Sequence, residues 1–148
     1  MARQPKERPD VQVFTQIAII DQLVTNRLER VLPEGLSHAQ FGVLTQLGRH
    51  GGDTTPAELA RLFQVTKGAI TNTLQRLEGQ GFITVEPDPN DGRRKRISVT
   101  PAGVTVHDKA LLAMRPLHDT LRSAFTEQEF VAVLPFLKAL RTWLEEGR

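Results

Sequence analysis

The stretch PDPNDGRRKRISVT, residues 87–100, decides the fold because it joins a turn to a strand. Its two prolines and the run Asn90, Asp91 and Gly92 are typical of a reversal of the chain. FITVE before the turn and RKRISVT after it alternate with a period of two and are rich in Ile, Val and Thr, which predicts strands. We therefore predict a β-hairpin with four successive basic residues, 93–96, at its tip and on its return strand.

The basic run has two interpretations, a solvated hairpin tip or a surface that binds a polyanion. The distribution of charge favours the second. Residues 61–100 carry seven basic and four acidic groups, a net charge of +3, whereas the other 108 residues carry −1 and the whole chain +2. A positive field concentrated in one part of the chain is typical of a local polyanion-binding surface.

Helices are predicted on both sides of the hairpin from their start signals. SHAQ (37–40), TPAE (55–58) and TEQE (126–129) each fit a capping box, and TPAG places a proline at the first helical position after Thr100. Together with apolar residues spaced by three and four, these signals predict six helices. The first has about 20 residues and ends before Pro33, and the others lie at 37–49, 56–63, about 67–78, 101–123 and 127–145.

This order of elements predicts a winged helix-turn-helix. A short helix, a tight turn, a second helix and a two-stranded hairpin follow one another, and in such proteins the second helix enters the major groove of DNA. The expected fold is mainly α with a small β-hairpin wing, in one domain of residues 1–148. Residues 36–100 would form the DNA-binding lobe, and residues 10–32 and 101–148 a helical dimerisation region.

The second helix of this motif has one apolar face and one polar face. Ile70, Leu74 and Leu77 fall on one side of a helical wheel, and the other side is small and polar without an acidic residue. Asn and Gln can bond adenine, and Arg can bond guanine. An exposed face without DNA contact is the alternative. The candidate contacts are Thr66, Lys67, Gly68, Ala69, Asn72, Gln75 and Arg76.

Residues 36–103 resemble the multiple antibiotic resistance regulator (MarR) family of bacterial transcription regulators. The resemblance is carried by LSHAQFGVLTQL, by TPAELARLFQVTKGAITNTLQRLEGQGFI and by DPNDGRRKRISVTPAG. The last string resembles the family's wing signature, with Asp91, Arg93, Thr100 and Gly103 at the characteristic positions. Val99 departs from it, because the family more often has Leu there.

The resemblance implies roles for the wing and for the terminal helices. Arg93 would enter the minor groove with Asp91 orienting it, and Arg94, Lys95 and Arg96 are candidate phosphate contacts. The terminal helices would form a homodimer, although packing onto the monomer's own core would also explain their apolar stripes. We expect the protein to be a transcription regulator that binds near-palindromic double-stranded DNA. Repression is its expected mode of action.

The resemblance also implies a pocket for a small-molecule, aromatic effector where the DNA-binding lobe meets the dimer helices. The candidate residues are Ile17, His38, Phe41 and Val106; the alternative is that all four are ordinary core. The chain has no cysteine, which excludes a thiol redox sensor.

Other classes of function lack their motifs. The sequence offers no Ser-His-Asp arrangement, no glycine-rich phosphate loop and no His-x-x-x-His pair among His38, His50, His107 and His118. We therefore expect neither an enzyme nor a metal or other cofactor. No apolar run approaches the ~18 residues of a membrane span, and a cytoplasmic location is expected. The remaining rival is a winged-helix module that binds proteins without sequence-specific DNA binding.

Overall fold

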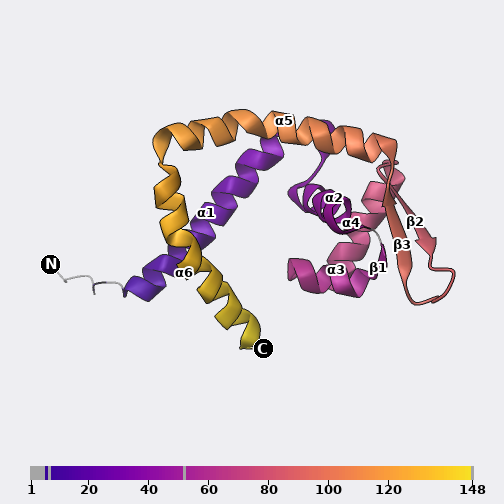
Figure 1. The fold of residues 1–148 in the computed structure, drawn as a ribbon, viewed down its shortest axis with the longest axis horizontal. Helices are drawn as coiled ribbons and strands as arrows, with labels where there is room; N and C mark the ends of the chain where they lie inside the picture. Colours follow the sequence, from indigo (N-terminus) through magenta and orange to yellow (C-terminus); the bar gives the residue numbers. More distant parts are fainter. Residues whose placement is uncertain (1–5, 7, 52, 148) are drawn as a thin grey trace. The chain divides into compact units, whose positions relative to one another are not determined.

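The computed structural model describes residues 6, 8–51 and 53–147. The chain forms two compact units, Met1–Ala113 and Met114–Arg148. The order of elements is the predicted one, with two short additions in the first unit, a 3-10 turn and the strand β1 (Figure 1). The elements are α1 (Pro9–Val31), the 3-10 turn Pro33–Gly35, α2 (His38–His50), β1 (Asp53–Thr54), α3 (Pro56–Phe63), α4 (Lys67–Gly79), β2 (Ile83–Pro87), β3 (Lys95–Val99), α5 (Pro101–Ala124) and α6 (Glu127–Glu146).

The helix starts are formed by the predicted caps. Ser37, Thr55 and Thr126 each accept a hydrogen bond from the backbone three residues on, and the Gln or Glu at that position binds back, so all three capping boxes are confirmed. The Thr100 hydroxyl accepts from the Gly103 backbone N–H at 3.1 Å. These local bonds satisfy N–H groups that a helix leaves unpaired in its first turn.

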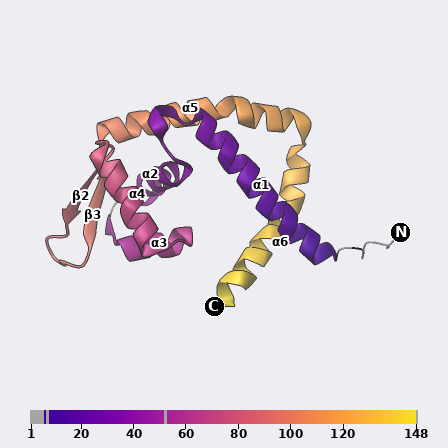
Figure 2. The same cartoon turned by 180° about the vertical axis from the view of Figure 1, so that it is seen from behind.

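The wing is an antiparallel sheet of strand order β1-β3-β2. Val85 on β2 pairs with Ile97 on β3, and the hairpin extends away from the helices of its unit in both views (Figures 1 and 2). The two-residue strand β1 was not predicted; it pairs Thr54 with Lys95. Thr100 fixes the far end of the hairpin, because its backbone N–H donates to the Phe82 carbonyl and its hydroxyl donates to the Gly81 carbonyl.

The core of the first unit lies between the helix-turn-helix, the hairpin and the first turns of α5. Its most completely buried side chains are Val43, Leu44, Leu77, Ile83, Ile97 and Val106. These residues come from α2, α4, both long strands and α5, so burial of apolar area, the main favourable term in folding, holds the wing and the second helix of the motif on one scaffold.

The second unit contains the end of α5 and α6. Phe125 and Phe130 pack edge to face across the turn between them, with ring centroids 6.2 Å apart. Pro116 and Pro135 lie inside continuous helices, although each removes one backbone N–H from the helical ladder. None of the residues Glu127–Glu146, all of which are described, is buried.

Candidate nucleic-acid interface

The two faces of α4 are those that the sequence predicts. Ile70, Leu74 and Leu77 are buried in the core. Every candidate contact on the other side is exposed: Lys67, Gly68, Ala69, Asn72, Gln75 and Arg76. The amide and guanidinium groups on this side are thus available to the edges of bases.

The start of α4 is set by a tight turn after α3. Gln64 adopts a left-handed conformation, with φ of 56°, and its side-chain amide donates to the Arg61 carbonyl at 2.7 Å. Thr66 then caps α4 by accepting from the Ala69 backbone N–H at 3.1 Å. The first turn contains no acidic residue, so the partial positive charge of the helix N-terminus suits a phosphate.

The tip of the wing is organised by two aspartates. Asp88 accepts from the Asn90 backbone N–H at 2.8 Å, and Asp91 accepts from the Arg93 backbone N–H at 2.9 Å. Asp91 therefore acts on the backbone of Arg93 in this structure, where the resemblance implied only that it orients this residue. Arg93 itself is exposed.

The other three basic residues of the wing differ in their surroundings. The Arg94 guanidinium forms an ion pair with Glu58 of α3, with Nη1 and Oε1 3.0 Å apart. On β3, Lys95 is half-buried and Arg96 is exposed, as the alternation of a strand requires. Lys95 and Gln75 line the same cavity of about 310 Å³ between α4 and the hairpin, so the structure brings together one candidate from each element.

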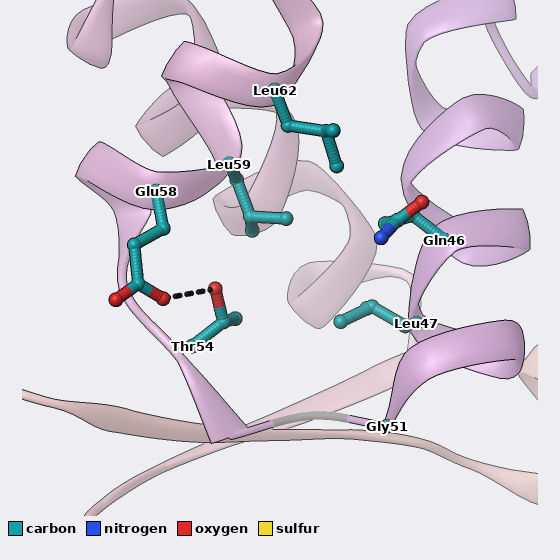
Figure 3. Close-up of a pocket in the computed structure, with 7 residues that line it drawn as sticks. All are labelled: Gln46, Leu47, Gly51, Thr54, Glu58, Leu59 and Leu62. Carbon is teal, nitrogen blue, oxygen red and sulfur yellow. Dashed lines mark hydrogen bonds between the residues drawn. The ribbon is translucent and has the colours of Figure 1, made fainter.

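A second cavity lies between α2 and α3. It has a volume of about 280 Å³ and is lined by Gln46, Leu47, Gly51, Thr54, Glu58, Leu59 and Leu62 (Figure 3). In this close-up the Glu58 carboxylate turns toward Thr54 and away from Leu62. The cavity is therefore bordered on one side by the carboxylate that binds the wing.

The effector candidates are not gathered around either of these two cavities. Val106 is buried in the core, and Phe41 packs against that core. Ile17 and His38 are exposed. The sequence predicted one pocket for these four residues, whereas the structure places two of them in or against the core of the first unit and two on its surface.

Sequence reasoning missed two interactions near these candidates. His107, considered above only as a metal ligand, is half-buried and stacks on Phe41 with ring centroids 5.1 Å apart and an interplanar angle of 11°. Its Nε2 lies 2.9 Å from the Thr45 hydroxyl. The spacing of Phe41 and Thr45, four residues apart on α2, is the only local signal. The ion pair of Glu58 with Arg94 was also missed, because the sequence around Glu58 indicates only its capping box with Thr55.

In the part of the chain that the structure describes, no group of three or more His, Asp or Glu residues could hold a metal ion; the side chain of His50 lies outside that part. No described helix combines the length and the apolar character needed to cross a membrane.

An exposed polar helix face followed by a basic wing defines the class of winged helix-turn-helix regulators that bind DNA. A sequence model of the MarR family matches residues 34–94. The multiple antibiotic resistance protein MarR of Escherichia coli K12 is 34% identical over 134 residues, which cover 84% of this chain and 92% of that protein. The chain belongs to the MarR family of DNA-binding transcription regulators. Proteins of this family are not enzymes, which confirms that prediction.

Solved structures agree on the fold. A mutant of E. coli MarR complexed with operator DNA superposes with a TM-score of 0.78 at 28% identity, over 88% of this chain and 94% of that one. An organohalide-sensing regulator in its 2,4-dichlorophenol-bound form gives a TM-score of 0.80 at 22% identity, over 96% of this chain and 87% of that one. The second likeness concerns the fold alone.

Proposed function

We propose that the chain is a homodimeric repressor that binds near-palindromic operators and releases them when a small aromatic ligand binds. The observation that carries the DNA-binding part is the exposed, acid-free outer face of α4, together with the exposed Arg93 of the wing. The E. coli MarR mutant of similar fold was determined with operator DNA. In our proposal α4 lies in the major groove through Asn72, Gln75 and Arg76.

The wing completes this interface. Arg93 enters the minor groove, and Lys95 and Arg96 lie near the backbone phosphates. The basic side chains of the wing repel one another, and a duplex neutralises Arg93, Lys95 and Arg96, so their attraction falls steeply with salt concentration. At the start of α4, Thr66, Gly68 and Ala69 have small side chains that allow close approach, and Lys67 adds a positive charge. The backbone N–H groups of Lys67 and Gly68 face one further phosphate in this proposal.

Dimerisation is supported by the exposed apolar side chains of the terminal helices. Within Pro9–Val31, which is fully described, α1 has no buried residue, and the same holds for α6. The exposed apolar residues of these helices include Phe14, Ile20, Leu23, Phe130, Leu134 and Trp143. Exposed apolar side chains in such number along a helix are typical of a permanent protein interface, and a two-fold dimer presents two copies of α4 to one duplex.

A small-molecule effector would act where α2 meets α5. Phe41 and His107 stack there, and Val106 lies beside them in the sequence of α5. An aromatic ring could join this stack, with Ile17 and His38 as the further candidates from α1 and α2. Such a ligand releases DNA only if it binds more tightly to the conformation in which the two copies of α4 are wrongly spaced.

Selection of duplexes from a random pool tests the DNA-binding part. The pure protein should enrich near-palindromic sequences with half-sites about one helical turn apart. Failure to retain any duplex at low salt would favour the protein-interaction module instead.

For the effector, phenolic compounds and salicylates are titrated into the protein–operator complex, with wild type beside Phe41→Ala. If no compound releases DNA, or if both proteins respond alike, the effector part is wrong.

A further inference from the structure

Arg94 leaves the tip of the wing and reaches the first turn of α3, 36 residues away in the sequence. Its Nη1 donates to Glu58 Oε1 at 3.0 Å, and its Nη2 lies 3.4 Å from Glu58 Oε2. Two parallel contacts of this kind form the fork that Arg makes with a carboxylate. The pair is partly exposed, with 35% of the Arg94 side chain and 47% of the Glu58 side chain accessible.

Glu58 is held in place independently of Arg94. Its carboxylate accepts from the Thr54 hydroxyl at 3.1 Å (Figure 3) and from the Thr55 backbone N–H at 3.3 Å. Its own backbone N–H donates to the Thr55 hydroxyl at 3.1 Å. The Thr54 hydrogen bond and, after it, Arg94 lower the pKa of Glu58 below its ordinary 4.5. Glu58 is therefore a fixed anion at neutral pH.

Arg94 also closes the turn of the wing through its backbone. Its N–H donates to the Asp91 carbonyl at 3.1 Å, and its carbonyl accepts from the Asp88 N–H at 3.2 Å. The residue that ties the wing to α3 thus adjoins Arg93 and shares Asp91 with it. A constraint on Arg94 is consequently a constraint on the position of Arg93.

We propose that the Glu58–Arg94 pair fixes the tip of the wing on the helix-turn-helix, so that Arg94 is a positioning residue and not a phosphate contact. The proposal rests on the DNA-binding function proposed above. A guanidinium that shares its charge with a carboxylate adds little to the attraction for phosphate. A wing already held in its binding position loses less conformational entropy when Arg93 enters the groove, and this raises affinity.

The proposal and the phosphate-contact alternative predict opposite signs for one substitution. Glu58→Gln removes the charge but keeps the cap of α3, since Gln serves at this position of a capping box. If the pair positions the wing, Glu58→Gln and Arg94→Gln each weaken operator binding by a similar factor, roughly three- to tenfold, and the double variant is no weaker than either. The slope of log K against log salt stays that of wild type for Arg94→Gln.

If Arg94 instead contacts phosphate, Arg94→Gln lowers the salt slope by about 0.9. Glu58→Gln then tightens binding, because it removes a negative charge near the duplex. Either result overturns the proposal, and so does unchanged affinity in both variants. Arg96→Gln and Glu86→Gln are the matched controls on the hairpin. The first should lower the slope, and the second reports the loss of a hairpin carboxylate that no contact ties to α3.

A measurement without DNA separates this proposal from the proposed function. Amide hydrogen exchange at residues 88–95 should be faster in Glu58→Gln and in Arg94→Gln than in wild type, with the amides of α4 unchanged. Equal exchange in the wing would show that the pair holds nothing, whatever the DNA result. If wild type binds no duplex but the two variants still exchange faster in the wing, the proposed function is refuted. The ion pair would then remain an anchor of the wing.

Discussion

Gly103, in the first turn of α5, has no room for a side chain. A Cβ at this position would overlap the backbone carbonyl of Phe82 and the side chain of Val99. The overlap arises because α5 begins against the end of the hairpin, where Thr100 binds Phe82. The glycine of the wing signature is therefore required by packing between a helix and a strand.

Gly103→Ala should consequently destabilise the fold by roughly 1–3 kcal/mol, the usual cost of overpacking. Gly48→Ala is the control, because nothing lies within 4 Å of a Cβ at that exposed helical position. There the substitution should stabilise by about 0.5–1 kcal/mol. Urea denaturation of the two variants gives both values, and equal midpoints would contradict this account of Gly103.

Arg93→Ala should weaken binding to the selected operator by roughly 1–3 kcal/mol, the scale of a groove contact. Lys95→Ala should cost less, almost equally on every sequence, and should lower the salt slope by about one. Fluorescence anisotropy titrations on operator and random duplexes measure both effects. If Arg93→Ala binds its operator as tightly as wild type, the role assigned to the wing is wrong.

At the scale of the element, the start of α3 combines two tasks in one carboxylate. Glu58 caps the helix through Thr55 and binds the wing through Arg94. Local sequence predicts the first task because a capping box spans only four residues. It cannot predict the second, because the partner lies 36 residues away and no periodicity relates the two positions.

The same distinction explains which elements the sequence reveals. Caps and apolar faces predicted all six α-helices, and the alternation of residues predicted β2 and β3. The strand β1 was missed because two residues are too few to alternate and its pairing with β3 is non-local. The stack of Phe41 on His107 was missed for that second reason, since it forms only when α2 packs on α5.

The contribution of the Glu58 charge to stability should change with pH only in acid. The groups around it, Thr54, Thr55 and Arg94, favour its charged form and lower its pKa. A lowered pKa means that the contribution is complete above the ordinary value of 4.5 and is lost as the pH falls through the folded-state value. The difference in melting temperature between wild type and Glu58→Gln should be constant from about pH 6 to 8 and shrink below about pH 4.5. A difference that changes near neutral pH would contradict this.

At the scale of the whole molecule, the terminal helices decide the state of assembly. Ile20 on α1 and Leu137 on α6 are exposed in the single chain, so a charge at either position costs a monomer little. In the proposed dimer the charge would be buried without a partner, which is strongly unfavourable. Ile20→Asp and Leu137→Asp should therefore sediment as monomers in analytical ultracentrifugation, and operator affinity should fall with the loss of the dimer.

Gln22→Glu on α1 is the matched control, because it adds a charge on the side of the helix away from Ile20. It should sediment as a dimer. Wild type that sediments as a monomer and still binds its operator would count against the dimer. Two dimeric aspartate variants would show that the interface lies elsewhere.

The contact between α2 and α5 has a defined arrangement of hydrogen atoms. The hydroxyl of Thr45 has a single hydrogen, which it donates to the Phe41 carbonyl at 3.0 Å. Its oxygen can then only accept from His107, so Nε2 of the imidazole must carry a hydrogen and Nδ1 is left as an acceptor in the neutral ring. The tautomer of His107 is thus dictated by a carbonyl that it never touches, four residues before Thr45 on the neighbouring helix.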